Sequence, residues 1–131
     1  MSAEREVIVC GGRDRKPSGA DAVWLSEQLA RLGATAVVHG GAKGYDRWAG
    51  ECARRFGLRV TVVEADWAEH GRAAGPIRNA NMAARRDVIA VIAFPGNAGT
   101  RHMVATAKRR GLQVVERDIR EWLAARAKGT A

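Results

Sequence analysis

Five short apolar runs, rich in β-branched residues, recur along this chain, and helical patterns separate them. The runs cover residues 6–10, 35–39, 58–64, 87–94 and 112–115. Each has the length of a strand, and strict alternation of strands with helices is typical of a parallel sheet with helices on both faces. The sequence therefore predicts a single three-layer α/β/α domain over residues 1–131, with its core at about 6–116 and a last helix at about 118–127.

The apolar character of the runs predicts the order of the strands. Residues 88–94 are apolar throughout, as in a central parallel strand, whereas residues 58–64 alternate more, as in an edge strand. Right-handed crossovers then give a Rossmann-like five-stranded parallel sheet of order 3-2-1-4-5. The order reverses between strands 1 and 4, and ligands of such sheets bind beyond the carboxyl ends of the strands at that point.

Capping signals and apolar spacing mark the predicted helices. Ser18 and Asp21 match a capping box at the start of the first helix. A short third helix is predicted at 79–86, after a long connection at 65–77 that is either a lid over a ligand or a fixed loop. Trp67, inside that connection, either stacks on a base or packs against the protein.

The net charge of +8 favours an anionic partner, such as a nucleotide, a nucleic acid or a phosphorylated metabolite. The alternative is a basic surface that is merely solvated. No apolar run is long enough to span a bilayer, and the first residues lack the pattern of a secretory signal. We therefore expect a cytoplasmic protein without membrane contact, in which Cys10 and Cys52 are free, buried thiols.

Three glycine-rich turns follow predicted strands, and the carboxyl ends of parallel strands meet at one edge of a sheet. Glycine lets backbone N–H groups approach a ligand closely, and the helix N-termini that follow add positive partial charge. Neither the dinucleotide fingerprint nor the P-loop is present, which disfavours an ordinary dehydrogenase or NTPase. The turn residues expected to hold a ligand are Gly11, Gly12, Gly40, Gly41, Ala42, Gly44, Pro95, Gly96, Asn97, Gly99 and Thr100.

Several side chains near these turns have both a ligand-binding and a structural interpretation. Arg13 pairs with a phosphate or lies on the surface, and Lys43 is a phosphate contact or a solvated cation. Asp46, early in a predicted helix, contacts a ribose or Arg78, or else it bonds the N–H groups of the neighbouring loop. Asn79 caps the helix predicted to begin there or contacts the ligand.

Four segments together carry a family resemblance: VIVCGGRD, VVHGGAKGYDRWA, ADWAEHGRAAGPIRNANMA and VIAFPGNAGTRHMVATAKRRGLQVV. In order and spacing, from about residue 6 to residue 116, they resemble the YspA-type family of the SLOG superfamily. That superfamily includes the cytokinin-activating LOG-type phosphoribohydrolases, the molybdenum-cofactor carrier proteins and the DNA-processing protein DprA. The resemblance implies a Rossmann-like domain that binds a nucleotide or a nucleotide-derived ligand, and SLOG proteins commonly form dimers.

The resemblance also implies candidate catalytic residues. LOG enzymes cleave the N-glycosidic bond of a nucleoside 5′-monophosphate with an arginine, whose counterpart is Arg78, and with a glutamate in the motif P-G-G-x-G-T-x-E. Four positions match this motif: Pro95, Gly96, Gly99 and Thr100. Asn97 replaces its middle glycine, and His102 stands where the glutamate would be. A carboxylate stabilises a developing oxocarbenium ion better than a histidine does, so Asp46 is the alternative acting group.

Three functions stay open on the sequence alone. The first is binding or sensing of a nucleotide, the second is hydrolysis of an N-glycosidic bond with those catalytic candidates, and the third is nucleic-acid binding like that of DprA. No His, Cys and Asp grouping has metal-ligand spacing, so no metal is predicted, and no cofactor other than a nucleotide ligand is expected. A homodimer is expected, in which Trp24, Trp48 and Trp122 are either interface or core residues.

Overall fold

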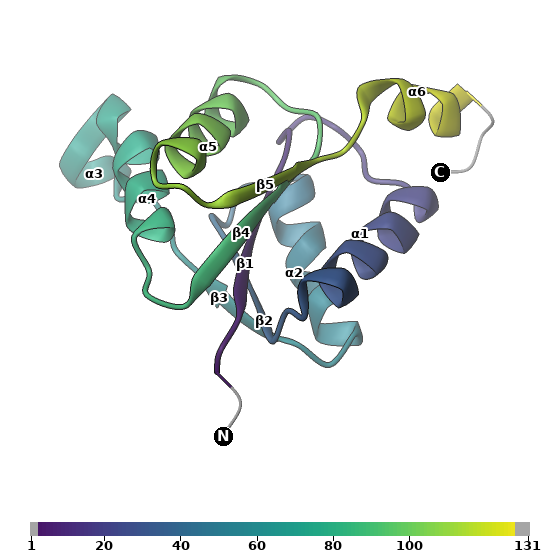
Figure 1. Cartoon of the computed structure of the whole chain (residues 1–131). Coiled ribbons are helices and arrows are strands. Elements are labelled where there is room, and N and C mark those ends of the chain that lie inside the picture. The colour runs from purple at the N-terminus through teal and green to yellow at the C-terminus, as the bar shows by residue number, and fades with distance from the viewer. Residues whose placement is uncertain (1–2, 128–131) are drawn as a thin grey trace.

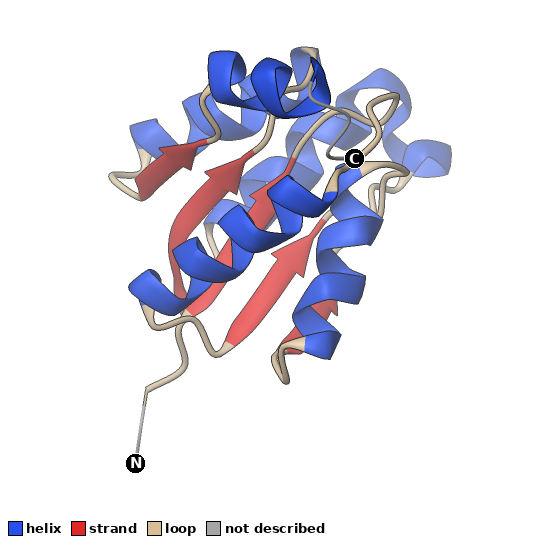
Figure 2. Cartoon of the chain, turned by 90° about the vertical axis from the view of Figure 1, so that its right-hand side faces the viewer, coloured by secondary structure: helices blue, strands red, loops and turns tan. Residues whose placement is uncertain are grey.

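A computed structural model describes residues 3–127, so the ends of the predicted domain, 1–2 and 128–131, lie outside the described residues. Within residues 3–127, five strands form one parallel sheet of order β3-β2-β1-β4-β5, which confirms the predicted order. The strands are β1 (Glu6–Cys10), β2 (Ala36–His39), β3 (Arg59–Val62), β4 (Val88–Ala93) and β5 (Gln113–Glu116). Figure 2 shows them running in the same direction.

Helices cover both faces of the sheet, with α1 and α2 on one face and α3, α4 and α5 on the other (Figure 1). The helices are α1 (Gly19–Leu32), α2 (Tyr45–Arg55), α3 (Trp67–His70), the 3-10 turn η1 (Gly71–Ala73), α4 (Ala74–Ala83), α5 (Ala98–Arg109) and α6 (Ile119–Ala127). This arrangement confirms the predicted Rossmann-like architecture. None of these described helices has the length and apolar character needed to cross a bilayer.

Strand β1 shows how the sheet divides the core, because all of its residues are buried and successive side chains point to opposite faces. Val7 and Val9 belong to the cluster that packs under α1 and α2. Ile8 and Cys10 belong to the cluster on the other face, with Met82 of α4. Cys10 is a free thiol, as predicted, and it stands at the carboxyl edge of the sheet.

Trp24, Trp48 and Trp122 pack against or within the core of this chain. Trp24 and Trp48 pack edge-on against Phe94, with ring centroids 5.2 and 5.4 Å apart. Trp122 is 4% exposed, and its indole N–H donates to the Tyr45 hydroxyl at 2.6 Å. Of the two interpretations of these tryptophans, these contacts favour core packing over a dimer interface.

Helix α4 corrects the predicted third helix. The prediction was 79–86, whereas α4 spans Ala74–Ala83. Pro76, which falls in the predicted connection at 65–77, lies in the first turn of α4, where a backbone N–H has no partner within the helix. Because α3 and η1 precede α4 directly, most of the long connection is helical.

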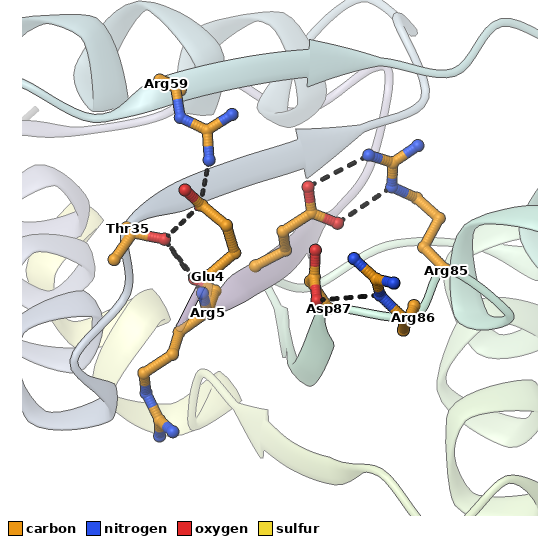
Figure 3. A network of polar contacts seen from close by, with 8 residues as sticks. Glu4, Arg5, Thr35, Arg59, Arg85, Arg86 and Asp87 are labelled. Atoms are coloured by element: carbon orange, nitrogen blue, oxygen red, sulfur yellow. Dashed lines mark hydrogen bonds and ion pairs between the residues drawn. The ribbon is translucent and has the colours of Figure 1, made fainter. Parts of the chain in front are cut away.

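Ion pairs fasten the amino ends of the strands (Figure 3). Glu6, 5% exposed in β1, accepts hydrogen bonds from Nε and Nη2 of Arg85 at 2.9 and 3.0 Å. Glu4 accepts a hydrogen bond from the Thr35 hydroxyl and pairs with Arg59. A buried carboxylate needs such a partner. These contacts therefore stabilise the sheet at the amino ends of its strands, while the glycine-rich turns lie at the carboxyl ends.

Candidate functional site

The three glycine-rich turns meet at the carboxyl edge of the sheet, as the sequence predicted. The N–H of Gly12, after β1, donates to the carbonyl of Pro95, after β4, at 2.9 Å. The N–H of Tyr45, which follows the turn after β2, donates to the Gly12 carbonyl at 3.5 Å. The N-termini of α2 and α5 are thereby held beside the turn that follows β1.

A cavity of about 1040 Å³ opens beside these turns. Its lining comes from the three turns and from α2, α4 and α5. Its volume is at the upper end of the range of small-molecule sites. Of the residues predicted to bind or act on a ligand, it brings together Gly11, Arg13, Gly40, Gly41, Ala42, Lys43, Asp46, Arg78, Asn79, Asn97, Gly99, Thr100 and His102.

Four of the predicted ligand residues do not line that cavity. Gly12 and Gly44 face each other where the turns pack, because a β-carbon on Gly44 would lie 2.5 Å from the Gly12 carbonyl oxygen. Pro95 and Gly96 instead line a smaller neighbouring cavity of about 510 Å³. The structure thus separates glycines whose backbone lines the larger cavity from glycines at which two turns pack together.

Two arginines that the sequence did not single out also line the larger cavity. Arg47, in the first turn of α2, donates from Nε to the Gly41 carbonyl at 2.8 Å. Arg101, in the first turn of α5, lines both cavities. Their signal in the sequence is a cation in a first helical turn, where the helix dipole disfavours it. The remaining lining residues are Cys10, Glu64, Ala65, Trp67, Gly75, Pro76, Met82, Ala98 and Met103.

The larger cavity is basic. Two acidic side chains, Asp46 and Glu64, oppose five basic ones. The basic ones are Arg13, Lys43, Arg47, Arg78 and Arg101. None of the five forms an ion pair within residues 3–127, and Arg13, Lys43 and Arg101 also form no side-chain hydrogen bond there, unlike Arg47 and Arg78. An anion entering this cavity would therefore meet a net positive field with uncommitted cations.

Asp46 fastens the turn that follows β2. It is 6% exposed, and its Oδ2 accepts hydrogen bonds from the N–H groups of Gly40 and Ala42 at 3.2 and 3.4 Å. Bonding of the neighbouring N–H groups is therefore what the structure shows, and contact with a ribose stays a prediction. Burial raises the pKa of Asp46 to about 6, although the Arg78 guanidinium and the backbone N–H groups act to lower it.

Arg78 reaches the same turn from α4. Its Nη1 donates to the Gly40 carbonyl at 2.7 Å, and its Nε donates to Oδ1 of Asn79 at 2.9 Å. A β-carbon on Gly40 would lie 2.6 Å from the guanidinium carbon and 3.0 Å from Oδ2 of Asp46. Gly40 is thus flanked by a cation and an anion, and a larger residue there would displace them.

Asn79 lies in the middle of α4, which corrects the interpretation of Asn79 as a helix cap. Its Nδ2 donates to the Gly99 carbonyl at 3.3 Å and lies 3.1 Å from Nδ1 of His102. Since an amide nitrogen only donates, Nδ1 of His102 accepts in this contact. Asn79 therefore ties α4 to the turn that begins α5 and orients His102 in the cavity wall.

The raised pKa of Asp46 predicts a pH dependence of folding stability. Its carboxyl has a pKa of about 6 in the folded protein and 3.8 in an unfolded chain. The folded state therefore binds more protons between these two values, and the free energy of unfolding falls as the pH rises through that range. Between pH 4.5 and 7.5, the loss amounts to about 2 kcal/mol. The free energy of unfolding of Asp46→Asn minus that of the wild type should therefore be larger at pH 7.5 than at pH 4.5 by that amount. Urea unfolding at the two pH values measures this difference.

A matched variant separates this effect from the change in net charge. Asp14→Asn removes the same charge from an exposed turn, and its stability offset at each pH is subtracted from that of Asp46→Asn. If the corrected offset of Asp46→Asn is the same at both pH values, the buried carboxyl does not titrate as inferred.

The sheet and the cavity at its strand-order switch place the protein in the class of Rossmann-like α/β proteins. Within that class, the chain belongs to the YspA, cpYpsA-related SLOG family, whose model matches residues 5–70. The chain is also similar to the Gene 61 protein of Mycobacterium phage D29. The identity is 38% over 122 residues, covering 85% of this chain and 94% of that protein. The family resemblance seen in the sequence is thereby confirmed.

Proposed function

We propose that this protein binds a nucleotide or a nucleotide-derived ligand in the larger cavity. The observation that carries the proposal is the meeting of three glycine-rich turns with five basic side chains in one cavity. Backbone N–H groups and helix N-termini bind phosphate, and cations neutralise it. Membership of the SLOG family supports the same class of ligand.

In this proposal the phosphate lies against the three turns and the ribose lies beside Asp46. Arg13 and Lys43 are exposed and form no ion pair among the described residues. Contact of these two side chains with a phosphate therefore breaks no existing ion pair. Arg78 is already oriented by the Gly40 carbonyl. Trp67, 59% exposed at the cavity rim, offers a flat face on which a base stacks.

Hydrolysis of an N-glycosidic bond is a second candidate function, and Asp46 is the residue that favours it. A buried carboxyl in the cavity wall with a pKa of about 6 is in the range that general acids and bases use. Turnover that is lost in Asp46→Asn while binding persists would support this reaction. Binding without turnover in the wild type would leave sensing as the function.

A thermal-shift experiment tests the binding proposal. Purified protein is heated with AMP, other nucleoside monophosphates, ADP-ribose or NAD, and with inorganic phosphate as the control. A ligand at about one hundred times its Kd adds roughly 2.7 kcal/mol to the free energy of unfolding, which raises Tm by several degrees. We expect such a shift with at least one nucleotide and none with phosphate.

If no nucleotide raises Tm at millimolar concentration, the proposal is overturned, and nucleic acid or a protein becomes the favoured partner. Nucleic-acid binding has its own signature, because its affinity falls steeply as salt concentration rises. A labelled oligonucleotide titrated at two salt concentrations therefore distinguishes that alternative from the binding of a mononucleotide.

A further inference from the structure

The smaller cavity, of about 510 Å³, adjoins the larger one and shares Thr100 and Arg101 with it. It lies between the turn after β4, the end of β5 and the start of α6. Phe94, Val104 and Ile119 give it apolar walls. Two cavities that share a wall at the edge of the sheet can be occupied by two parts of one ligand.

The acidic groups of the smaller cavity are already engaged within the protein. Glu116 lies 4.0 Å from Nζ of Lys108. The carboxylate of Asp118 accepts hydrogen bonds from the backbone N–H groups of Arg120 and Glu121 at 2.8 and 3.0 Å. Neither carboxylate forms an ion pair with Arg15 or Arg101 among the described residues.

Two arginines of the smaller cavity are uncommitted. Arg15 and Arg101 form no ion pair within the described part of the chain. The guanidinium of Arg15 lies over the Trp122 ring, 5.2 Å from its centroid, a contact that leaves its N–H groups available. By contrast, Arg117 pairs with Asp21 at 3.5 Å. The smaller cavity thus combines apolar walls with two arginines that form no ion pair among the described residues.

The first turn of α5 forms the boundary between the two cavities. Thr100, 9% exposed, lines both of them. Asn97, the N-cap of α5, makes no side-chain hydrogen bond to this turn. A ligand group that lies between the two cavities therefore meets the backbone N–H groups at the start of α5, which have no side-chain cap. It also meets the Arg101 side chain, and both features favour an anion.

The volumes of the two cavities exceed what one nucleoside needs. The larger cavity alone, at about 1040 Å³, is at the top of the range of small-molecule sites. The smaller cavity, at about 510 Å³, is within the same range on its own. A mononucleotide in the larger cavity would leave the smaller cavity and Arg15 unused.

We infer that the ligand has two arms joined by a phosphate bridge. A nucleoside occupies the larger cavity, the bridge lies at the start of α5 beside Arg101, and a second sugar or ring group occupies the smaller cavity near Arg15. This inference rests on the proposed function, because the larger cavity must take the nucleoside. Dinucleotides and nucleoside-diphosphate sugars share this chemistry.

Binding isotherms with AMP, ADP, ADP-ribose and NAD test the inference. ADP-ribose or NAD should bind at least about tenfold more tightly than AMP and ADP, a difference of about 1.4 kcal/mol. Arg15→Glu reverses a charge at an exposed position of the smaller cavity and should remove that advantage while leaving the AMP affinity within about threefold. Arg31→Glu, the same change at the C-terminal end of α1, should affect neither class of ligand.

The outcomes separate this inference from the proposed function. Equal affinities for AMP and for both two-armed ligands would overturn the inference and leave nucleotide binding intact. An equal loss of affinity for all ligands in Arg15→Glu would also overturn the inference, because the charge of residue 15 would then act on the whole site. If no nucleotide binds, both proposals fail. Tight binding of ADP-ribose but not of NAD would support the inference and assign the second arm as a sugar.

Discussion

Replacing Gly44 by alanine is expected to lower the free energy of unfolding by about 3 kcal/mol or more. Gly44 has a φ of 78° and a ψ of −128°, a backbone conformation that costs an alanine about 1–3 kcal/mol. The new β-carbon would also lie 2.5 Å from the Gly12 carbonyl oxygen and 2.8 Å from that of Arg13. These are backbone atoms that cannot rotate away, and overpacking of this kind costs a further 1–3 kcal/mol or so. Urea unfolding measures the loss.

Gly57 offers a matched control for this prediction. Its φ is 81°, and no other atom lies within 4 Å of the place where its β-carbon would stand. Gly57→Ala should therefore cost only the conformational part, about 1 kcal/mol. The difference between the two variants combines the packing of the turns after β1 and β2 with the stricter backbone conformation at Gly44. Equal losses in both variants would contradict that packing.

The fold could be predicted because its main determinants are local in the sequence. Apolar runs of strand length alternate with capped helices, and the capping box of Ser18 and Asp21 is present in the structure. The errors lie where tertiary context decides. The run at 58–64 is longer than β3, because β2 offers β3 partners only from Ala36 to His39.

The position of the candidate site could also be predicted, but the roles of its residues could not. The glycines of the turns cannot be told apart in the sequence, yet the backbone of Gly41 lines the larger cavity while Gly44 packs against the backbone of Gly12. That difference depends on segments that are distant along the chain and meet only in the folded sheet. For the same reason the sequence could not show that Arg101 stands between two cavities.

Arg78→Ala is expected to weaken nucleotide binding by about 10- to 100-fold. The guanidinium is held by the Gly40 carbonyl and by Asn79, so it faces the larger cavity in a fixed orientation. Hydrogen bonds to charged groups contribute about 1.5–3 kcal/mol each, which corresponds to roughly that loss of affinity. The substitution also leaves Asp46 without its nearby cation, which adds repulsion of a phosphate.

Calorimetric titration of the folded variants with the nucleotide found by thermal shift measures this loss. Arg86→Ala is the control, because its side chain is 93% exposed and pairs only with Asp87 among the described residues. Arg78→Lys should bind with intermediate affinity, since an ammonium keeps the charge but lacks the fork of donors. Arg78 lowers the pKa of Asp46, so that pKa should rise further in Arg78→Ala. If Arg78→Ala binds as tightly as the wild type, the phosphate lies elsewhere in the cavity and Arg78 serves only to hold the turn at Gly40.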